Sequence, residues 1–196
     1  MSKVLEYIRS KVSDNPYVTF DSEGKGVSRV FDLSWNFSSL NQNQVEVSFK
    51  NTNPVHRKNI QSYIYAVMDW QIKDSPSNSH SAVSTIDRYR SNLVVVSERL
   101  GSSDFATLSN EHVWNKFMKK IKGYGSESGC KVIASTINVL NKVNLIDRFV
   151  TRAEYCKWIK PGSKGQGQAI AIPESIYANF LKKGGGFCRR ISPPST

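Results

Sequence analysis

The sequence predicts an α+β protein, in which a small antiparallel β-meander precedes a mainly α-helical bundle of four or five helices. Two observations predict this class. Apolar residues alternate with polar ones in parts of residues 17–49, which is typical of strands with one buried face. From residue 54 onward apolar residues recur three or four positions apart, which is typical of amphipathic helices. We therefore expect a β region over 1–53, a helical region over 54–160, and a linker, a short helix and an irregular tail over 161–196.

The β region is expected to open with a short helix and to continue as three strands. The first dozen residues place Leu5, Ile8 and Val12 on one apolar side of a helix. The strands are expected at residues 17–20, 30–37 and 45–49, joined by polar turns. A sheet this small must bury its apolar face against a helix to be stable.

The helical region is expected to begin at Pro54, because proline fits the first position of a helix and Asn53 can cap it. A second helix is expected over about 82–100, although the valines at 94–96 favour strands. Ser109 is the expected N-cap of a third helix, and further helices are expected at about 128–143 and 148–158. Another is expected at 174–183. Because the tail beyond it lacks periodicity, we expect a truncation or frame shift near residue 183.

The charge of the chain indicates an anionic partner. The sequence carries 27 Lys and Arg against 16 Asp and Glu, a net charge of +11. Residues 109–164 hold 11 of the basic and 4 of the acidic side chains, so the excess is concentrated there. A strong positive excess on one part of a domain is typical of proteins that bind nucleic acid or an anionic membrane surface.

The candidate DNA-binding residues are basic side chains expected to lie on exposed helix faces. Four lysines at 116–122 lie opposite the apolar stripe of the third helix and can face one phosphate backbone. Arginines of the second helix can also make bidentate contacts to phosphate or guanine, unless Asp87 or Glu98 pairs with them. The full candidate set is Arg57, Lys58, Arg88, Arg90, Lys116, Lys119, Lys120, Lys122, Lys131, Lys142 and Arg148.

Other kinds of site find little support in the sequence. Cys130, Cys156 and Cys188 have no metal-binding spacing, so we expect buried free thiols, no metal and no cofactor. No histidine pair, phosphate loop or nucleophile motif occurs, which predicts a protein without catalytic residues. The sequence also holds no apolar run of about 18 residues, so no membrane span is expected. We expect a cytoplasmic protein.

Residues 79–149 resemble the N-terminal, SAM-like core-binding domain of tyrosine recombinases and phage-type integrases. The resemblance rests on the succession of segments 84–89, 93–100, 105–109, 113–121, 126–140 and 141–146, and residues 168–177 resemble the connector toward the catalytic domain of such proteins. It implies a helical bundle that clamps one side of double-stranded DNA, with self-association on DNA as an option, in a prokaryotic or phage-encoded protein. The family's catalytic Arg, Lys, His-x-x-Arg box and nucleophilic Tyr have no counterparts in this sequence.

Two further interpretations stay open at this point. The chain could be a basic protein-interaction module that docks an acidic protein or an anionic membrane surface. It could also be an enzyme, which a deep pocket joining His112, Glu111 and a tyrosine would favour.

Overall fold

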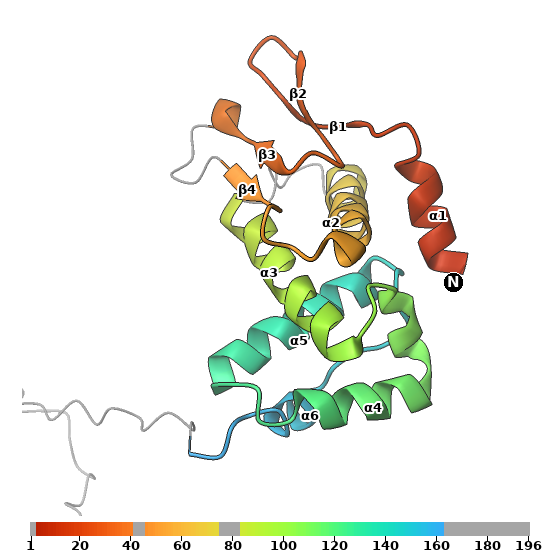
Figure 1. Cartoon of the computed structure of the whole chain (residues 1–196), viewed down its shortest axis with the longest axis vertical. Coiled ribbons are helices and arrows are strands. Elements are labelled where there is room, and N and C mark those ends of the chain that lie inside the picture. The colour runs from red at the N-terminus through yellow and green to blue at the C-terminus, as the bar shows by residue number, and fades with distance from the viewer. Residues whose placement is uncertain (1–2, 41–45, 75–82, 163–196) are drawn as a thin grey trace, which may run out of the picture. The chain divides into compact units, whose positions relative to one another are not determined.

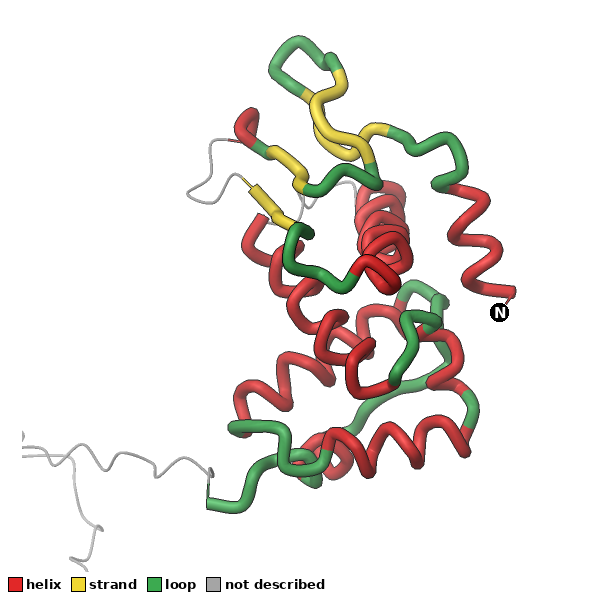
Figure 2. Tube along the Cα trace, viewed as in Figure 1, coloured by secondary structure: helices red, strands yellow, loops and turns green. Residues whose placement is uncertain are grey.

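The α+β class is confirmed by the computed structural model, which describes residues 3–40, 46–74 and 83–162. These residues belong to one compact unit that spans residues 1–164. Small antiparallel hairpins lie near the N-terminus, and helices make up most of the remainder (Figures 1 and 2). The helix expected at 174–183 and Cys188 lie outside the described residues.

The N-terminal helix α1 (Lys3–Lys11) packs against the first long helix, α2 (Pro54–Asp74). Leu5, Ile8 and Val12 are buried, as their spacing predicts. They belong to the same hydrophobic core as the buried residues of α2 and of the later helices. The expected division at residue 53 stays a prediction, while the described residues on its two sides share one core.

The strands form two separate hairpins, which corrects the single strand predicted over residues 30–37. Strand β1 (Tyr17–Phe20) pairs with β2 (Gly26–Arg29), and β3 (Ser34–Asn36) pairs with β4 (Glu46–Ser48). Asp32 interrupts the predicted strand, because its carboxylate accepts from the Arg29 N–H at 2.7 Å and stabilises a turn. Leu33, which follows this turn, is 49% exposed.

The second hairpin contributes aromatic side chains to the core. Trp35 and Phe49 are fully buried, with ring centroids 4.8 Å apart. The Trp35 indole N–H donates to the Val30 carbonyl at 3.0 Å, so its polar atom is satisfied. Strand β4 also contacts helix α3 (Val83–Leu100), which gives this small sheet the helical support that it needs.

Helix α3 is the central element of the helical part. It contacts α2, α4 (Glu111–Ile121), α5 (Glu127–Lys142) and β4. Its valines at 94–96 stay helical, because the tertiary contacts of this helix outweigh the local preference for strand. Two short 3₁₀ segments, η1 (Ser38–Leu40) and η2 (Phe105–Ser109), and the short helix α6 (Arg152–Cys156) complete the elements of the described residues. Helix α6 is shorter than the 148–158 predicted.

The ends of the helices follow specific capping interactions. The Asn53 side chain accepts from the Val55 N–H at 3.0 Å, which confirms the start of α2. Helix α4 is capped by Asn110 rather than by the predicted Ser109, since the Asn110 side chain accepts from the N–H groups of His112 and Val113. The Ser109 hydroxyl accepts instead from the Asp147 N–H at 2.8 Å.

We predict that Asn110→Ala lowers the free energy of unfolding by about 1 kcal/mol, because two N–H groups at the start of α4 lose their acceptor. Chemical denaturation monitored by circular dichroism measures this change. Asn110→Ser keeps a capping oxygen and should retain most of the stability. Equal stability of the alanine and serine variants would contradict the assignment of this cap.

Candidate nucleic-acid interface

Helix α4 has one buried apolar face and one lysine-rich exposed face. Trp114, Phe117 and Ile121 are buried, as predicted. The lysines predicted as phosphate contacts are all exposed: Lys116, Lys119, Lys120 and Lys122. Since side chains three or four positions apart share a face of a helix, burial of the apolar stripe turns Lys116, Lys119 and Lys120 toward solvent. Lys122 directly follows the last residue of α4.

The apolar face of α4 packs on Trp158, which lies just after α6. Trp158 is fully buried, and its ring centroid lies 6.0 Å from that of Phe117 and 6.4 Å from that of Trp114, both edge to face. Its indole N–H points to the Met118 sulfur, with Nε1 and Sδ 2.9 Å apart. Edge-to-face aromatic pairs have a preferred geometry, so this cluster fixes the rotation of α4 about its axis.

Two backbone hydrogen bonds hold the chain after α6 against the loop between α4 and α5. The Tyr124 N–H donates to the Trp158 carbonyl, and the Lys160 N–H donates to the Gly125 carbonyl, each at 2.9 Å. Gly123 has a φ of +73°, a conformation that a glycine adopts without strain and that turns the chain at the end of α4. These contacts bring Lys160 beside the C-terminal end of α4.

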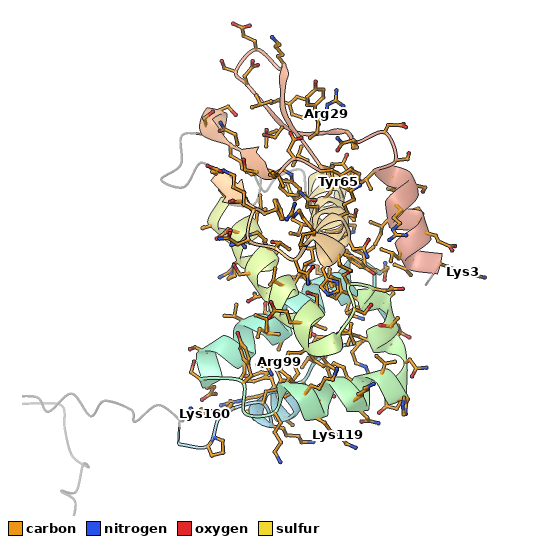
Figure 3. The ribbon with its side chains drawn as sticks, viewed as in Figure 1. Lys3, Arg29, Tyr65, Arg99, Lys119 and Lys160 are labelled. Carbon is orange, nitrogen blue, oxygen red and sulfur yellow. The ribbon has the colours of Figure 1, made fainter. Side chains whose placement is uncertain are left out.

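The end of α3 also reaches this region. The Arg99 Nη1 donates to the Lys120 carbonyl at 3.4 Å, and its guanidinium carbon lies 5.9 Å from the centre of the Tyr124 ring. Figure 3 shows Arg99, Lys119 and Lys160 in the same part of the unit, on three different segments. We call this group the α4 basic surface and define it by seven residues: Arg99, Lys116, Lys119, Lys120, Lys122, Tyr124 and Lys160.

The lysines of α4 have no acidic partners in the part of the chain that the structure describes. No carboxylate there lies within salt-bridge distance of Lys116, Lys119, Lys120 or Lys122. Of the other predicted contacts, Arg88 and Lys131 are exposed and equally lack a described acidic partner. An anion could therefore approach these side chains without displacing a carboxylate.

Two of the predicted arginines are instead held by neighbouring carboxylates. Arg90 Nε donates to the Asp87 carboxylate at 2.8 Å, which is the pairing that the sequence allowed as an alternative. Arg148 Nη2 donates to Glu111 at 2.6 Å, and its guanidinium lies 4.8 Å from the centre of a Trp114 ring. Arg148 also donates to the Leu108 carbonyl, so it joins α4 to the segment after α5.

The remaining residues predicted to bind DNA contact other parts of the protein. Arg57 donates to the Thr52 carbonyl at 3.0 Å, and Lys58 lies 5.6 Å from the centre of the Phe31 ring. Lys142 lies 5.3 Å from the Trp70 ring centre on α2. The eleven predicted residues are thus spread over several parts of the unit, and the α4 lysines form their most coherent group. Arg99 was not among them, because no local signal shows that the end of α3 meets α4.

The structure also describes the residues considered for an enzyme site and the cysteines. Glu111 binds Arg148 and Asn115, which occupies its carboxylate, and His112 is exposed. Cys130 is buried, and burial raises the pKa of its thiol, whereas Cys156 is exposed, which corrects the expectation that it is buried. Across residues 3–40, 46–74 and 83–162, no three His, Cys, Asp or Glu side chains are grouped to hold a metal ion. No helix in these ranges has the length and apolar character needed to cross a membrane.

Comparisons with protein-family models, with curated proteins and with solved structures find no match to this chain.

The half-buried Arg148 and the exposed Lys119 should respond differently to substitution. We predict that Arg148→Ala lowers the free energy of unfolding by about 1–2 kcal/mol, because it removes the side-chain donor to the Leu108 carbonyl and the charged donor to Glu111. Lys119→Ala should change stability by less than about 0.5 kcal/mol, as exposed side chains without partners usually do. Urea titrations of both variants measure the difference, and a larger loss for Lys119→Ala would contradict the structural role given to Arg148.

Proposed function

We propose that this chain is the DNA-binding portion of an integrase-like site-specific recombinase, which clamps duplex DNA through its basic helical face and has no catalytic residues of its own. The observation that carries the proposal is the set of exposed α4 lysines without described acidic partners, next to Arg99 and Lys160. The resemblance of residues 79–149 to core-binding domains supports it. A cytoplasmic location in a prokaryotic or phage system belongs to the same proposal.

The lysines suit contacts with the DNA backbone. Each ammonium group is a compact charge on a flexible stem, which can follow phosphates without demanding one geometry. Such contacts position a protein on the duplex but carry no sequence information. Tyr124 is half-buried beside them and could pack on a sugar or base at the edge of the contact.

The alternative proposal is a basic interaction module for an acidic protein or an anionic membrane surface. The same lysines would serve it, because any dense array of negative charge satisfies them. It differs from the DNA proposal in its ligand preference: vesicles with anionic lipid, or heparin, should bind at least as well as duplex DNA.

We predict that affinity for duplex DNA falls with salt, with a slope of log K against log[salt] of about −4 to −5 if roughly five phosphates are neutralised. Fluorescence anisotropy with labelled duplex, single-stranded DNA and anionic vesicles, each at several salt concentrations, measures the preference and the slope. A slope near zero, or equal binding to vesicles, would contradict duplex DNA as the partner.

The lysines can then be tested one at a time. Lys116→Gln, Lys119→Gln and Lys120→Gln should each weaken binding to all duplexes and reduce the magnitude of the slope by about 1. Lys25→Gln is the matched control, because it removes one exposed lysine from the turn between β1 and β2. If the control has the same effect as the α4 variants, net charge rather than the α4 basic surface explains the binding.

A further inference from the structure

The arginines of the described residues divide into a bound group and a second group of two. Each bound arginine donates to, or forms an ion pair with, an identified oxygen acceptor, and these residues are Arg9, Arg29, Arg57, Arg90, Arg148 and Arg152. The other two lie on α3. Arg88 is exposed and has no acceptor among the described residues, and Arg99 is exposed with one long hydrogen bond of 3.4 Å.

Arg88 and Arg99 lie on the same face of α3. They are eleven positions apart, which is close to three helical turns and corresponds to about 16 Å along the axis. The buried residues Ile86 and Leu93 lie on the opposite side of the helix, whereas the buried Val96 lies nearer to Arg99, about 60° around the axis from it. Both arginine side chains are exposed, and between them, on the same side of α3, Asn92 contacts α5. Other parts of the helix pack against α2 and α4.

Contacts of α3 with neighbouring segments fix the direction in which the two arginines project. Asn92 lies between the two arginines, and its side-chain N–H donates to the Thr136 hydroxyl of α5 at 2.7 Å. This bond holds α3 against α5 at one rotation. At the end of the helix, the contact with the Tyr124 ring restricts Arg99, so fewer side-chain conformations are lost when its remaining donors meet a ligand.

Guanidinium and ammonium groups differ in what they recognise on DNA. The planar guanidinium donates two parallel hydrogen bonds to O6 and N7 of guanine, which is a common specific contact in the major groove. The α4 lysines lack this geometry and suit phosphates. The structure thus places two kinds of cation on neighbouring helices: on α3, two arginines that have no carboxylate partner among the described residues, and on α4, the lysines.

We propose that Arg88 and Arg99 are the residues of this chain that determine DNA sequence preference, each by recognising a guanine, while the α4 lysines contact the backbone. This inference rests on the proposed function and adds sequence-specific duplex DNA as the ligand class. It assigns Arg99 a role that the sequence alone did not indicate. It also separates Arg88 from Arg90, whose guanidinium is occupied by Asp87.

The test is a selection of binding sequences from a pool of random duplexes, carried out with the full chain. Wild-type protein should enrich a sequence with two guanine-containing positions. Arg99→Lys and Arg88→Lys keep the charge but lose the bidentate geometry, so each should abolish the preference at a different one of these positions. Each should weaken binding to the selected duplex by about tenfold, as expected for one lost base contact, and leave binding to random duplex nearly unchanged.

The control is Arg152→Lys, because Arg152 is highly exposed and forms its ion pair with Glu127. It should retain the full preference. Thermal unfolding of each variant verifies the fold. Arg88→Gln and Arg99→Gln provide a second pair of variants, which should lose the base preference at the same two positions of the duplex.

The outcomes separate this inference from the proposed function. The role of the two arginines is overturned if wild-type protein binds random duplex but enriches no sequence, or if Arg88→Lys and Arg99→Lys keep the wild-type preference. In both cases the proposed binding of duplex DNA is retained. If wild-type protein binds no duplex at all, the proposed function fails, and the inference fails with it.

Discussion

The packing of Trp158 under α4 is the interaction on which the candidate interface depends. Its ring fills the space beside Trp114 and Phe117, and the backbone on either side bonds to Tyr124 and Gly125. Burying a tryptophan removes roughly 200 Å² of mainly apolar surface from water, so this contact contributes several kcal/mol. Because the apolar face of α4 is held here, its lysines lie on the exposed side of the helix.

Much of the fold could be predicted from the sequence, because its helices carry regular apolar spacing. The start of α2 at Pro54 and the burial of Ile60, Ile64, Trp114 and Phe117 follow from that pattern and from helix capping. The predictions were wrong where a polar side chain formed a local hydrogen bond that the apolar spacing does not indicate. Asp32 bonds to the Arg29 N–H and interrupts a strand, and Asn110 takes the capping role expected of Ser109. Both hydrogen bonds depend on the local backbone geometry, which the spacing of apolar residues does not reveal.

The candidate site was less predictable, because exposure and pairing of a basic residue are tertiary properties. The sequence placed Lys116 and Lys119 on an exposed face correctly, since the apolar stripe defines the opposite side. It did not indicate that Arg148 pairs with Glu111, which lies 37 positions away, or that Lys142 contacts the Trp70 ring. Arg57 near the start of α2 is a further example, since its partner is not a phosphate or a carboxylate in the described structure. The structure gives Arg57 a backbone carbonyl there, which supplies the negative end of a peptide dipole.

The central position of α3 buries part of a segment whose composition favours aggregation. Residues 91–97 include three consecutive valines and contain no charge, glycine or proline, which is the composition of a segment prone to cross-β aggregation. In the folded protein they are helical, and Leu93 and Val96 are buried. Arg90 and Glu98 flank the segment with opposite charges, as gatekeeper residues do. Shortened forms that lack α4 and α5 would uncover this segment, so aggregation rather than simple loss of binding is the expected fate of such fragments.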